Sequence, residues 1–181
     1  MKLSLRLGVV LVMALSITQQ TAFAATTPII PTIKLSTNLT TTFNRPGLLS
    51  PSAGWGLSES QGTWAILSEA SMNLTFPKFS KEAVIAFSSW GMVTPKNPTV
   101  TLTIFVNSKT PKPVGTFIYN ATYDKGVRLF DVPINLLKGN LSNVPFLFKI
   151  TGNQSPHNLG LSSDKRTLGV YLQDITLKYI S

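Results

Sequence analysis

The segment Thr99-Val100-Thr101-Leu102-Thr103-Ile104 alternates polar and apolar residues without interruption. Successive side chains of a β-strand point to opposite faces, so Val100, Leu102 and Ile104 would share one face and the threonines the other. A strand packed on a core along one side and solvated along the other has this pattern. The segment therefore indicates β-structure at the centre of the chain.

Similar runs of apolar and β-branched residues recur on both sides of this segment, each bounded by Gly, Pro, Asn or Ser. No run keeps a helical period, although Pro133–Leu137 suits one short helix or turn. We predict about eight strands: Lys34–Phe43, Glu69–Phe76, Ala83–Ser88, Thr99–Val106, Val114–Asn120, Gly126–Ile134, Phe146–Thr151 and Leu168–Ile180. Many short strands without helices are typical of a sandwich or barrel. We expect an all-β fold, an antiparallel two-sheet β-sandwich of jelly-roll type.

The last predicted strand carries one irregularity. Leu172, Ile175 and Leu177 do not keep a strict period of two. A single added residue in a strand shifts the period in this way, so we expect a β-bulge or a bend there.

The first 24 residues have the three parts of a secretory signal peptide. Lys2 and Arg6 precede the apolar run Gly8–Ile17, and Ala22-Phe23-Ala24 matches an A-x-A cleavage site. The apolar run is shorter than the roughly 20 residues of a spanning helix. We expect cleavage after Ala24, export to the periplasm or the extracellular space, and no membrane span in the mature chain.

Composition favours one domain that is stabilised by its core. The chain has 181 residues and no cysteine, so disulfides cannot contribute to its stability. Residues 25–33 hold Pro28 and Pro31 and are predicted to form an extended leader. We expect residues 34–181 to form the single β-sandwich domain.

The net charge of +9 reflects scarce acidic residues more than dense basic ones, since only 13% of the residues are charged. The lysines and arginines are scattered, with no run of five. A nucleic-acid-binding surface would gather them on one face, so we expect no nucleic-acid partner. Two interpretations remain open: a soluble basic surface, or weak attraction to anionic polymers or headgroups of a cell envelope.

One candidate ligand-binding stretch is Gly54-Trp55-Gly56-Leu57-Ser58-Glu59-Ser60-Gln61-Gly62-Thr63-Trp64. Tryptophan offers a flat apolar face and one N–H donor, and glycine lets a partner approach the backbone. Carbohydrate sites use this combination, so Trp55, Glu59 and Trp64 are candidate contacts. The alternatives are that Trp64 plugs the core, that Trp55 closes the end of the sandwich, and that Glu59 caps local backbone N–H groups.

A second stretch, residues 155–170, is predicted to be a long loop that leads into the last strand. Asp164 can accept backbone N–H bonds, as acidic residues in turns commonly do. Arg166 can form a forked pair with a carboxylate such as Glu59, which would tie the two stretches together at one end of the sandwich. His157 is a further candidate contact. A purely structural clamp is the alternative interpretation.

The two stretches read G-W-x-x-x-E-x-x-G-x-W and S-P-x-x-L-G-x-S-x-D-x-R-x-L-G-V-x-L. This pattern resembles a poorly characterised bacterial exported domain, which also occurs at the ends of membrane-bound sugar or phosphoglycerol transferases. That family resembles galactose-binding-like β-sandwiches. The resemblance implies association with an envelope or a glycan and provides no catalytic set.

Catalytic and metal sites have little support. One histidine and no cysteine exclude a Cys-His pair and a His-rich zinc site, and no G-x-S-x-G segment is present. Seven acidic residues leave open a carboxylate pair such as Glu59 and Asp164, as in a glycosidase. We predict no catalytic residue, no metal ligand and no cofactor.

The sequence therefore favours an exported, non-catalytic binding module that recognises a glycan or an envelope polymer through Trp55, Glu59, Trp64, His157, Asp164 and Arg166. A structural or adhesive protein that binds a protein partner is the first alternative, since exposed β edges permit strand addition. A small polysaccharide-active enzyme is the second.

Overall fold

A computed structural model describes residues 33–34, 49–76, 82–106, 112–137 and 141–179. The predicted signal peptide (residues 1–24) lies outside the described residues. So does the predicted leader (residues 25–33), apart from Ile33. No helix within the described ranges is long and apolar enough to cross a membrane.

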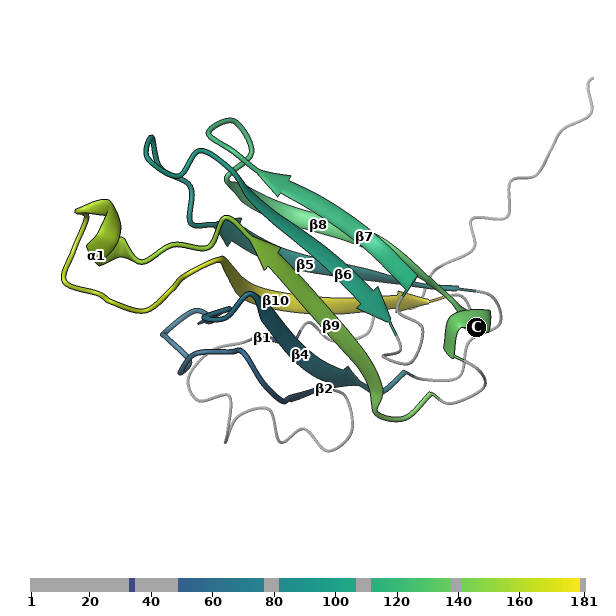
Figure 1. Cartoon of the computed structure of the whole chain (residues 1–181). Coiled ribbons are helices and arrows are strands. Elements are labelled where there is room, and N and C mark those ends of the chain that lie inside the picture. The colour runs from purple at the N-terminus through teal and green to yellow at the C-terminus, as the bar shows by residue number, and fades with distance from the viewer. Residues whose placement is uncertain (1–32, 35–48, 77–81, 107–111, 138–140, 180–181) are drawn as a thin grey trace, which may run out of the picture.

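The described residues form ten strands and two short helices (Figure 1). The strands are β1 (Ile33–Lys34), β2 (Leu49–Pro51), β3 (Thr63–Trp64), β4 (Glu69–Leu74), β5 (Glu82–Gly91), β6 (Val100–Val106), β7 (Lys112–Tyr119), β8 (Lys125–Pro133), β9 (Val144–Thr151) and β10 (Val170–Tyr179). The 3-10 helix η1 (Ile134–Leu137) follows β8, and helix α1 (Pro156–Leu159) lies between β9 and β10.

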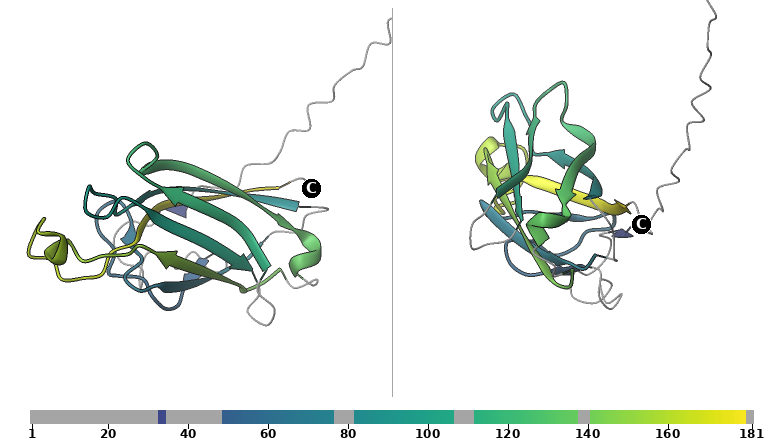
Figure 2. Two further views of the ribbon diagram at one scale, coloured as in Figure 1. Left: turned by 45° about the horizontal axis from the view of Figure 1, so that its top comes forward. Right: turned by 90° about the vertical axis from the view of Figure 1, so that its right-hand side faces the viewer.

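The strands form two antiparallel sheets that pack face to face (Figure 2). Sheet A has the order β1-β10-β5-β8, with β3 also paired to β10, and sheet B has the order β2-β4-β9-β6-β7. Without the short strands β1 and β2, each sheet has four strands, β3-β10-β5-β8 and β4-β9-β6-β7. Along the chain, successive strands from β3 to β10 cross from one sheet to the other except at the β6–β7 hairpin. The predicted jelly-roll β-sandwich is therefore confirmed.

Seven of the eight predicted strands correspond to β4 through β10, and η1 occupies the predicted turn at Pro133–Leu137. Of the predicted strand Lys34–Phe43, only Lys34 is described, in β1, and the rest lies outside the described residues. Strands β2 and β3 were not predicted because they are too short to show a period. Helix α1 lies inside the segment predicted to be a loop.

The core lies between the sheets and follows the predicted alternation. Strand β6 alternates buried and half-buried residues along its whole length, with Val100, Leu102 and Ile104 almost fully inaccessible to solvent. Phenylalanine rings from both sheets meet in the centre: Phe87 and Phe130 of sheet A contact Phe117 and Phe146 of sheet B, respectively. Each fully buried apolar side chain contributes about 1.5–3 kcal/mol, so this core can stabilise the fold without disulfides.

The predicted irregularity in the last strand is a shift of register between β10 and β5. Leu172 pairs with Ser89 and Asp174 pairs with Ser88, so Gln173 is the added residue. Leu172 and Ile175 therefore both face the core, and both are almost completely buried. The same shift leaves Tyr171 and Asp174 on the outer face of sheet A, which is central to the site described next.

Candidate functional site

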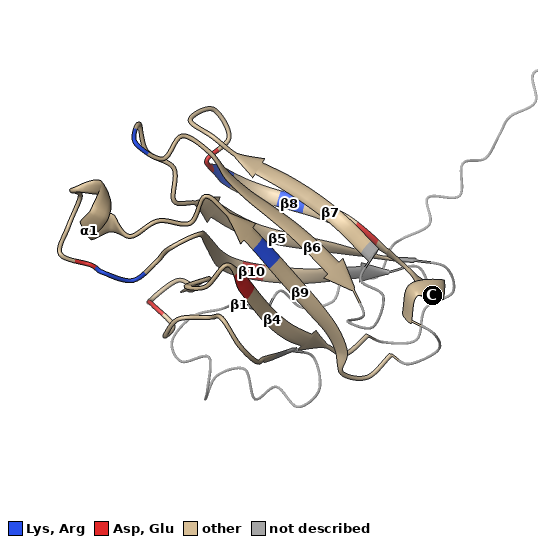
Figure 3. Cartoon of the chain, in the orientation of Figure 1, with Lys and Arg blue, Asp and Glu red and all other residues tan. Residues whose placement is uncertain are grey.

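The two stretches that the sequence singled out meet at one end of the sandwich. The loops after β2, β5, β7 and β9 gather there, and α1 projects beyond the strand ends (Figure 1). Charged residues are sparse along the strands, and the loop between α1 and β10 carries adjoining acidic and basic positions (Figure 3).

Arg166 joins the two stretches by contacting two carboxylates. Its Nη2 donates to Glu59 Oε1 at 3.1 Å and to Asp164 Oδ2 at 2.7 Å, and its Nε donates to Asp164 Oδ2 at 3.0 Å. The Arg166 backbone N–H also donates to Asp164 Oδ1 at 2.9 Å. The predicted pairing of Arg166 with Glu59 is confirmed as a single hydrogen bond, whereas the forked contact is made to Asp164. The predicted turn role of Asp164 is confirmed. We call Glu59, Asp164 and Arg166 the clamp.

The charges of the clamp stabilise one another. The hydrogen bonds from the Arg166 side chain, and then from its backbone, hold the pKa of the Asp164 carboxyl below its usual value. The hydrogen bond to Asp164, followed by that to Glu59, raises the pKa of the Arg166 guanidinium. All three side chains keep partial access to solvent, so each ion pair contributes only modestly to stability.

Local turns place the members of the clamp. Glu59 and Gly62 exchange backbone hydrogen bonds across a two-residue turn, with the Glu59 N–H donating to the Gly62 carbonyl at 2.7 Å. A Cβ on Gly62 would lie 2.3 Å from the Leu172 carbonyl oxygen, so only glycine lets this turn lie against β10.

On the other side of the clamp, Ser155 caps α1. Its Oγ accepts from the Asn158 N–H and donates to the Asp164 carbonyl at 3.1 Å. Gly160 ends the helix in the left-handed conformation, with φ of 75°. These contacts shape the loop so that Asp164 and Arg166 face Glu59.

Trp55 packs against the core from the edge of the sandwich. Its ring meets Phe148 edge to face at a centroid distance of 5.4 Å, and its Nε1 donates to the Ser71 carbonyl at 2.9 Å. The N–H donor of Trp55 is therefore already engaged by the protein. This geometry matches the alternative in which Trp55 closes the sandwich, and its predicted ligand contact stays a prediction.

Trp64 belongs to a row of aromatic side chains on the outer face of sheet A. In the register of β3, β10 and β5, Tyr171 pairs with Trp64 on one side and with Trp90 on the other. Directly paired residues of antiparallel strands project from the same face. The Trp90 and Tyr171 rings stack at 4.0 Å and 16°, and the Trp64 ring meets Tyr171 edge to face at 5.1 Å. We call Trp64, Tyr171 and Trp90 the aromatic row.

The aromatic row and the clamp are neighbours. Tyr171 is only 3% exposed because both tryptophan rings pack against it and against each other, while the two tryptophans remain half-buried. Burial, and next the negative charge of Glu59, raise the pKa of Tyr171, while a hydrogen bond with the Gln61 backbone acts in the opposite direction. The loop that carries Glu59 therefore borders the aromatic row.

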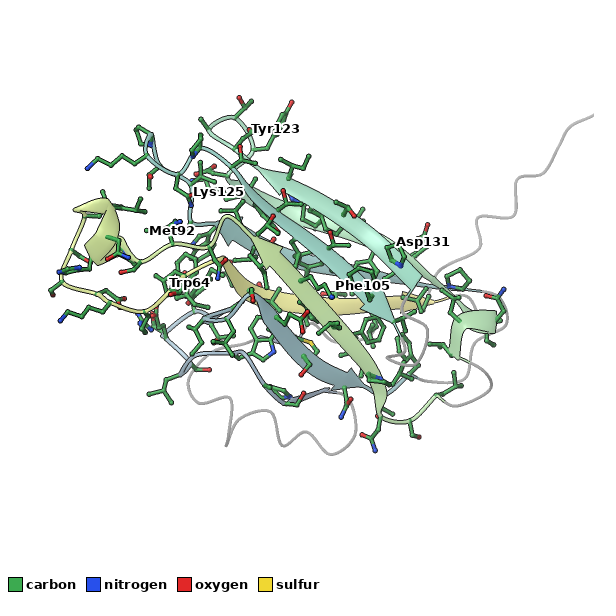
Figure 4. All side chains as sticks on the ribbon, in the orientation of Figure 1. Trp64, Met92, Phe105, Tyr123, Lys125 and Asp131 are labelled. Atoms are coloured by element: carbon green, nitrogen blue, oxygen red, sulfur yellow. The ribbon has the colours of Figure 1, made fainter. Side chains whose placement is uncertain are left out.

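Beside the aromatic row lies a hollow of about 210 Å³ on the same face. Polar groups of Ser88, Asp174 and Thr176 and apolar groups of Ala86, Phe87 and Val127 line it. Lys125 of β8 pairs directly with Trp90 and extends the row across a fourth strand. Trp64 and Lys125 lie near the end of the sheet where the loops gather (Figure 4).

His157 lies on α1 and is exposed. Its Nδ1 contacts Asn158 Oδ1 at 3.5 Å, and its backbone N–H donates to the Asp164 carbonyl at 2.8 Å. Within the described part of the chain, its imidazole makes no hydrogen bond to the clamp or to the aromatic row. Nor do any three His, Asp or Glu side chains of the described residues lie close enough to share a metal ion.

The sequence interpretation missed Trp90 and Tyr171. Trp90 lies two residues beyond the predicted strand Ala83–Ser88, on the same face as Ser88, so extending the alternation would have indicated it. Tyr171 had no comparable signal, because the bulge at Gln173 changes which residues of β10 face outward.

No family model and no curated protein matches the chain. Several solved structures are similar to it at low identity. A xylan-binding module, CBM15, is 12% identical over 74% of this chain and 97% of that chain, with a TM-score of 0.35. A mutant of CBM29-2, a family 29 carbohydrate-binding module, is 10% identical over 81% and 91%, with a TM-score of 0.36. SGBP-B, from a xyloglucan utilization locus of Bacteroides uniformis, is 9% identical over 85% and 46%, with a TM-score of 0.32.

Proposed function

We propose that this chain is an exported, non-catalytic module that binds carbohydrate on the outer face of sheet A. The observation that carries the proposal is the aromatic row, with Trp64 and Trp90 half-buried on the surface of a regular sheet. Tryptophan rings provide large apolar surfaces with little side-chain entropy to lose on binding. Export rests on the predicted signal peptide.

Polar groups beside the row suit a ligand that is apolar on one side and rich in hydroxyl groups at its edges. Ser88 and Thr176 line the hollow next to the row. Because the row and the hollow stand on paired strands, their side chains are held in place before the ligand arrives. Such a preorganised surface reduces the entropy cost of binding.

The clamp supports binding rather than catalysis in this proposal. A glycosidase needs a carboxyl with a raised pKa as its general acid. Glu59 and Asp164 instead share one guanidinium, and the pKa of Asp164 is lowered. We assign the clamp to positioning the loop that borders Tyr171.

An array of bacterial and host glycans tests the proposal, with the purified protein and its Trp90→Ala and Trp64→Ala variants. We expect selective binding that weakens roughly 30-fold or more in each variant, the loss typical of a central interface tryptophan. Phe105→Ala is the matched control, because Phe105 is a half-buried aromatic residue on the outer face of sheet B. Equal binding by wild type and both tryptophan variants would refute this site, and Trp55→Ala tests the remaining predicted contact.

A second candidate function, binding of a protein partner by strand addition, is favoured by β8. Among the described strands, β8 pairs only with β5. Its outward side chains Val127 and Leu129 are 62% and 58% exposed, so its free edge carries apolar groups that a partner strand can cover. Crosslinking in intact cells tests this candidate. A crosslinked protein that maps to residues 125–133 supports it, and crosslinks confined to other segments count against it.

A further inference from the structure

The Trp90 ring is half-buried, and its two faces have different neighbours. Tyr171 of β10 stacks on one face at 4.0 Å, nearly parallel. Strand β5 lies between β10 and β8, so the face of Trp90 turned away from Tyr171 looks toward β8. A sugar ring stacked on it would lie above Lys125 and Val127, at the rim of the hollow.

Lys125 brings an uncompensated positive charge to this position. It is exposed and pairs directly with Trp90, and it forms no ion pair within the described part of the chain. Asp124 precedes it in sequence and makes no ion pair with it either. Asp131 lies toward the opposite end of the same strand (Figure 4), six residues or roughly 20 Å away at the rise of a β-strand.

Two of the other acidic residues near the row, Glu59 and Asp164, are engaged by Arg166. Asp174 lines the hollow from β10, two strands from β8, so the carboxylate of a bound sugar would face Lys125 and β8 rather than β10. The chain as a whole has a net charge of +9, to which Lys2 and Arg6 of the predicted signal peptide contribute two, so its long-range field also attracts anions after cleavage.

We infer that the site selects an acidic sugar, whose ring stacks on Trp90 while its carboxylate pairs with Lys125 Nζ. This inference rests on the proposed function and adds the class of ligand. A single ammonium group matches the single charge of a hexuronate. Phosphate groups are more often held by an arginine fork or by several donors together, and no such set lies beside Trp90 among the described residues.

Isothermal titration of the full chain with polygalacturonate, alginate, neutral galactan and neutral mannan tests the inference at low and high salt. We expect the acidic polymers to bind more tightly than the neutral ones, with a preference that shrinks at high salt. Lys125→Gln should weaken binding of the acidic polymers by about fivefold, the upper range for an exposed ion pair, and leave binding of neutral polymers unchanged. Lys149→Gln is the control for loss of one positive charge, because Lys149 is an exposed lysine on the outer face of sheet B, where it pairs with Glu69 at 3.0 Å.

The possible failures are distinguishable. Binding of neutral polymers as tight as that of acidic ones, lost in Trp90→Ala and unchanged in Lys125→Gln, would overturn the inference and retain the proposed function. A loss in Lys149→Gln equal to that in Lys125→Gln would show a general charge effect and would also overturn it. Absence of binding to every polymer would refute both the proposed function and the inference.

Discussion

Replacing Trp90 by alanine removes two ring contacts from the aromatic row. Trp90 stacks on Tyr171 at 4.0 Å and meets Trp64 edge to face at 6.4 Å. Aromatic pairs contribute about 0.5–1.5 kcal/mol each, so the two contacts together account for about 1–3 kcal/mol of the free energy of unfolding. Truncation also removes the buried part of the ring, but because Trp90 is half-buried the total loss should not exceed the lower end of the roughly 3–5 kcal/mol lost at a fully buried tryptophan.

Urea denaturation followed by far-ultraviolet circular dichroism measures this loss. A double-mutant cycle with Trp90→Ala and Tyr171→Leu isolates the stacked pair, for which we expect a coupling energy of about 0.5–1.5 kcal/mol. For a domain of this size the single Trp90→Ala substitution should lower the Tm by about 2–12 °C. A coupling energy below about 0.3 kcal/mol would refute our interpretation of the row as a mutually supporting cluster.

Phe105→Ala serves as the control for this measurement. Phe105 lies on the outer face of the other sheet, where Lys149 Nζ is 5.7 Å from its ring centroid. An exposed cation–π contact contributes about 0.5–1 kcal/mol, so this variant should lose less stability than Trp90→Ala. A loss in Phe105→Ala as large as that in Trp90→Ala would show that the aromatic row stabilises the sandwich no more than an aromatic residue on the other outer face.

Three further outcomes are expected. Gly62→Ala should lower the free energy of unfolding by about 1–3 kcal/mol in urea titrations, because the added Cβ would lie 2.3 Å from the Leu172 carbonyl oxygen; unchanged stability would show that the turn can shift. Tyr119→Phe should cost about 1–3 kcal/mol in the same assay, since it removes the 2.7 Å hydrogen bond to Ser89 and leaves that hydroxyl buried. Adding Ser89→Ala should restore part of the loss, and a further loss would contradict this account. Burial raises the pKa of Tyr119 and of Tyr171 above their ordinary value of 10.0, so the folded state keeps protons that the unfolded state releases. Stability should therefore fall as the pH rises above 10.0, and thermal unfolding curves that do not change between about pH 9 and about pH 12 would contradict the expected shift.

The strands could be predicted because their side chains alternate. In β6 every second residue is apolar, and each of these is buried. The same local pattern indicated seven of the ten described strands and the break in β10. Strands β2 and β3 have three and two residues, so their local pattern is too short to be recognised.

Part of the clamp could be predicted from residue types, because an arginine has few acidic partners in a chain with seven acids. The pairing of Arg166 with Glu59 was predicted in this way, whereas the side-chain pairing of Arg166 with Asp164 was not. The prediction of ligand contacts was less complete. It placed Trp55 and Trp64 together because they are close in sequence, whereas Trp55 packs on Phe148 of sheet B and Trp64 stands beside Tyr171 on the outer face of sheet A.

The local pattern of residues is sufficient to specify strands, turns and an all-β fold, because alternation, glycine and proline act within a few residues. The local pattern is not sufficient to specify the aromatic row, since β3, β5 and β10 are far apart in the chain and meet only through sheet pairing. A shift of one residue in the pairing of β10 would turn Tyr171 into the core and Leu172 into solvent. Register, set by burial of Leu172 and Ile175 around the bulge at Gln173, is the physical reason that Trp64, Tyr171, Trp90 and Lys125 share one surface.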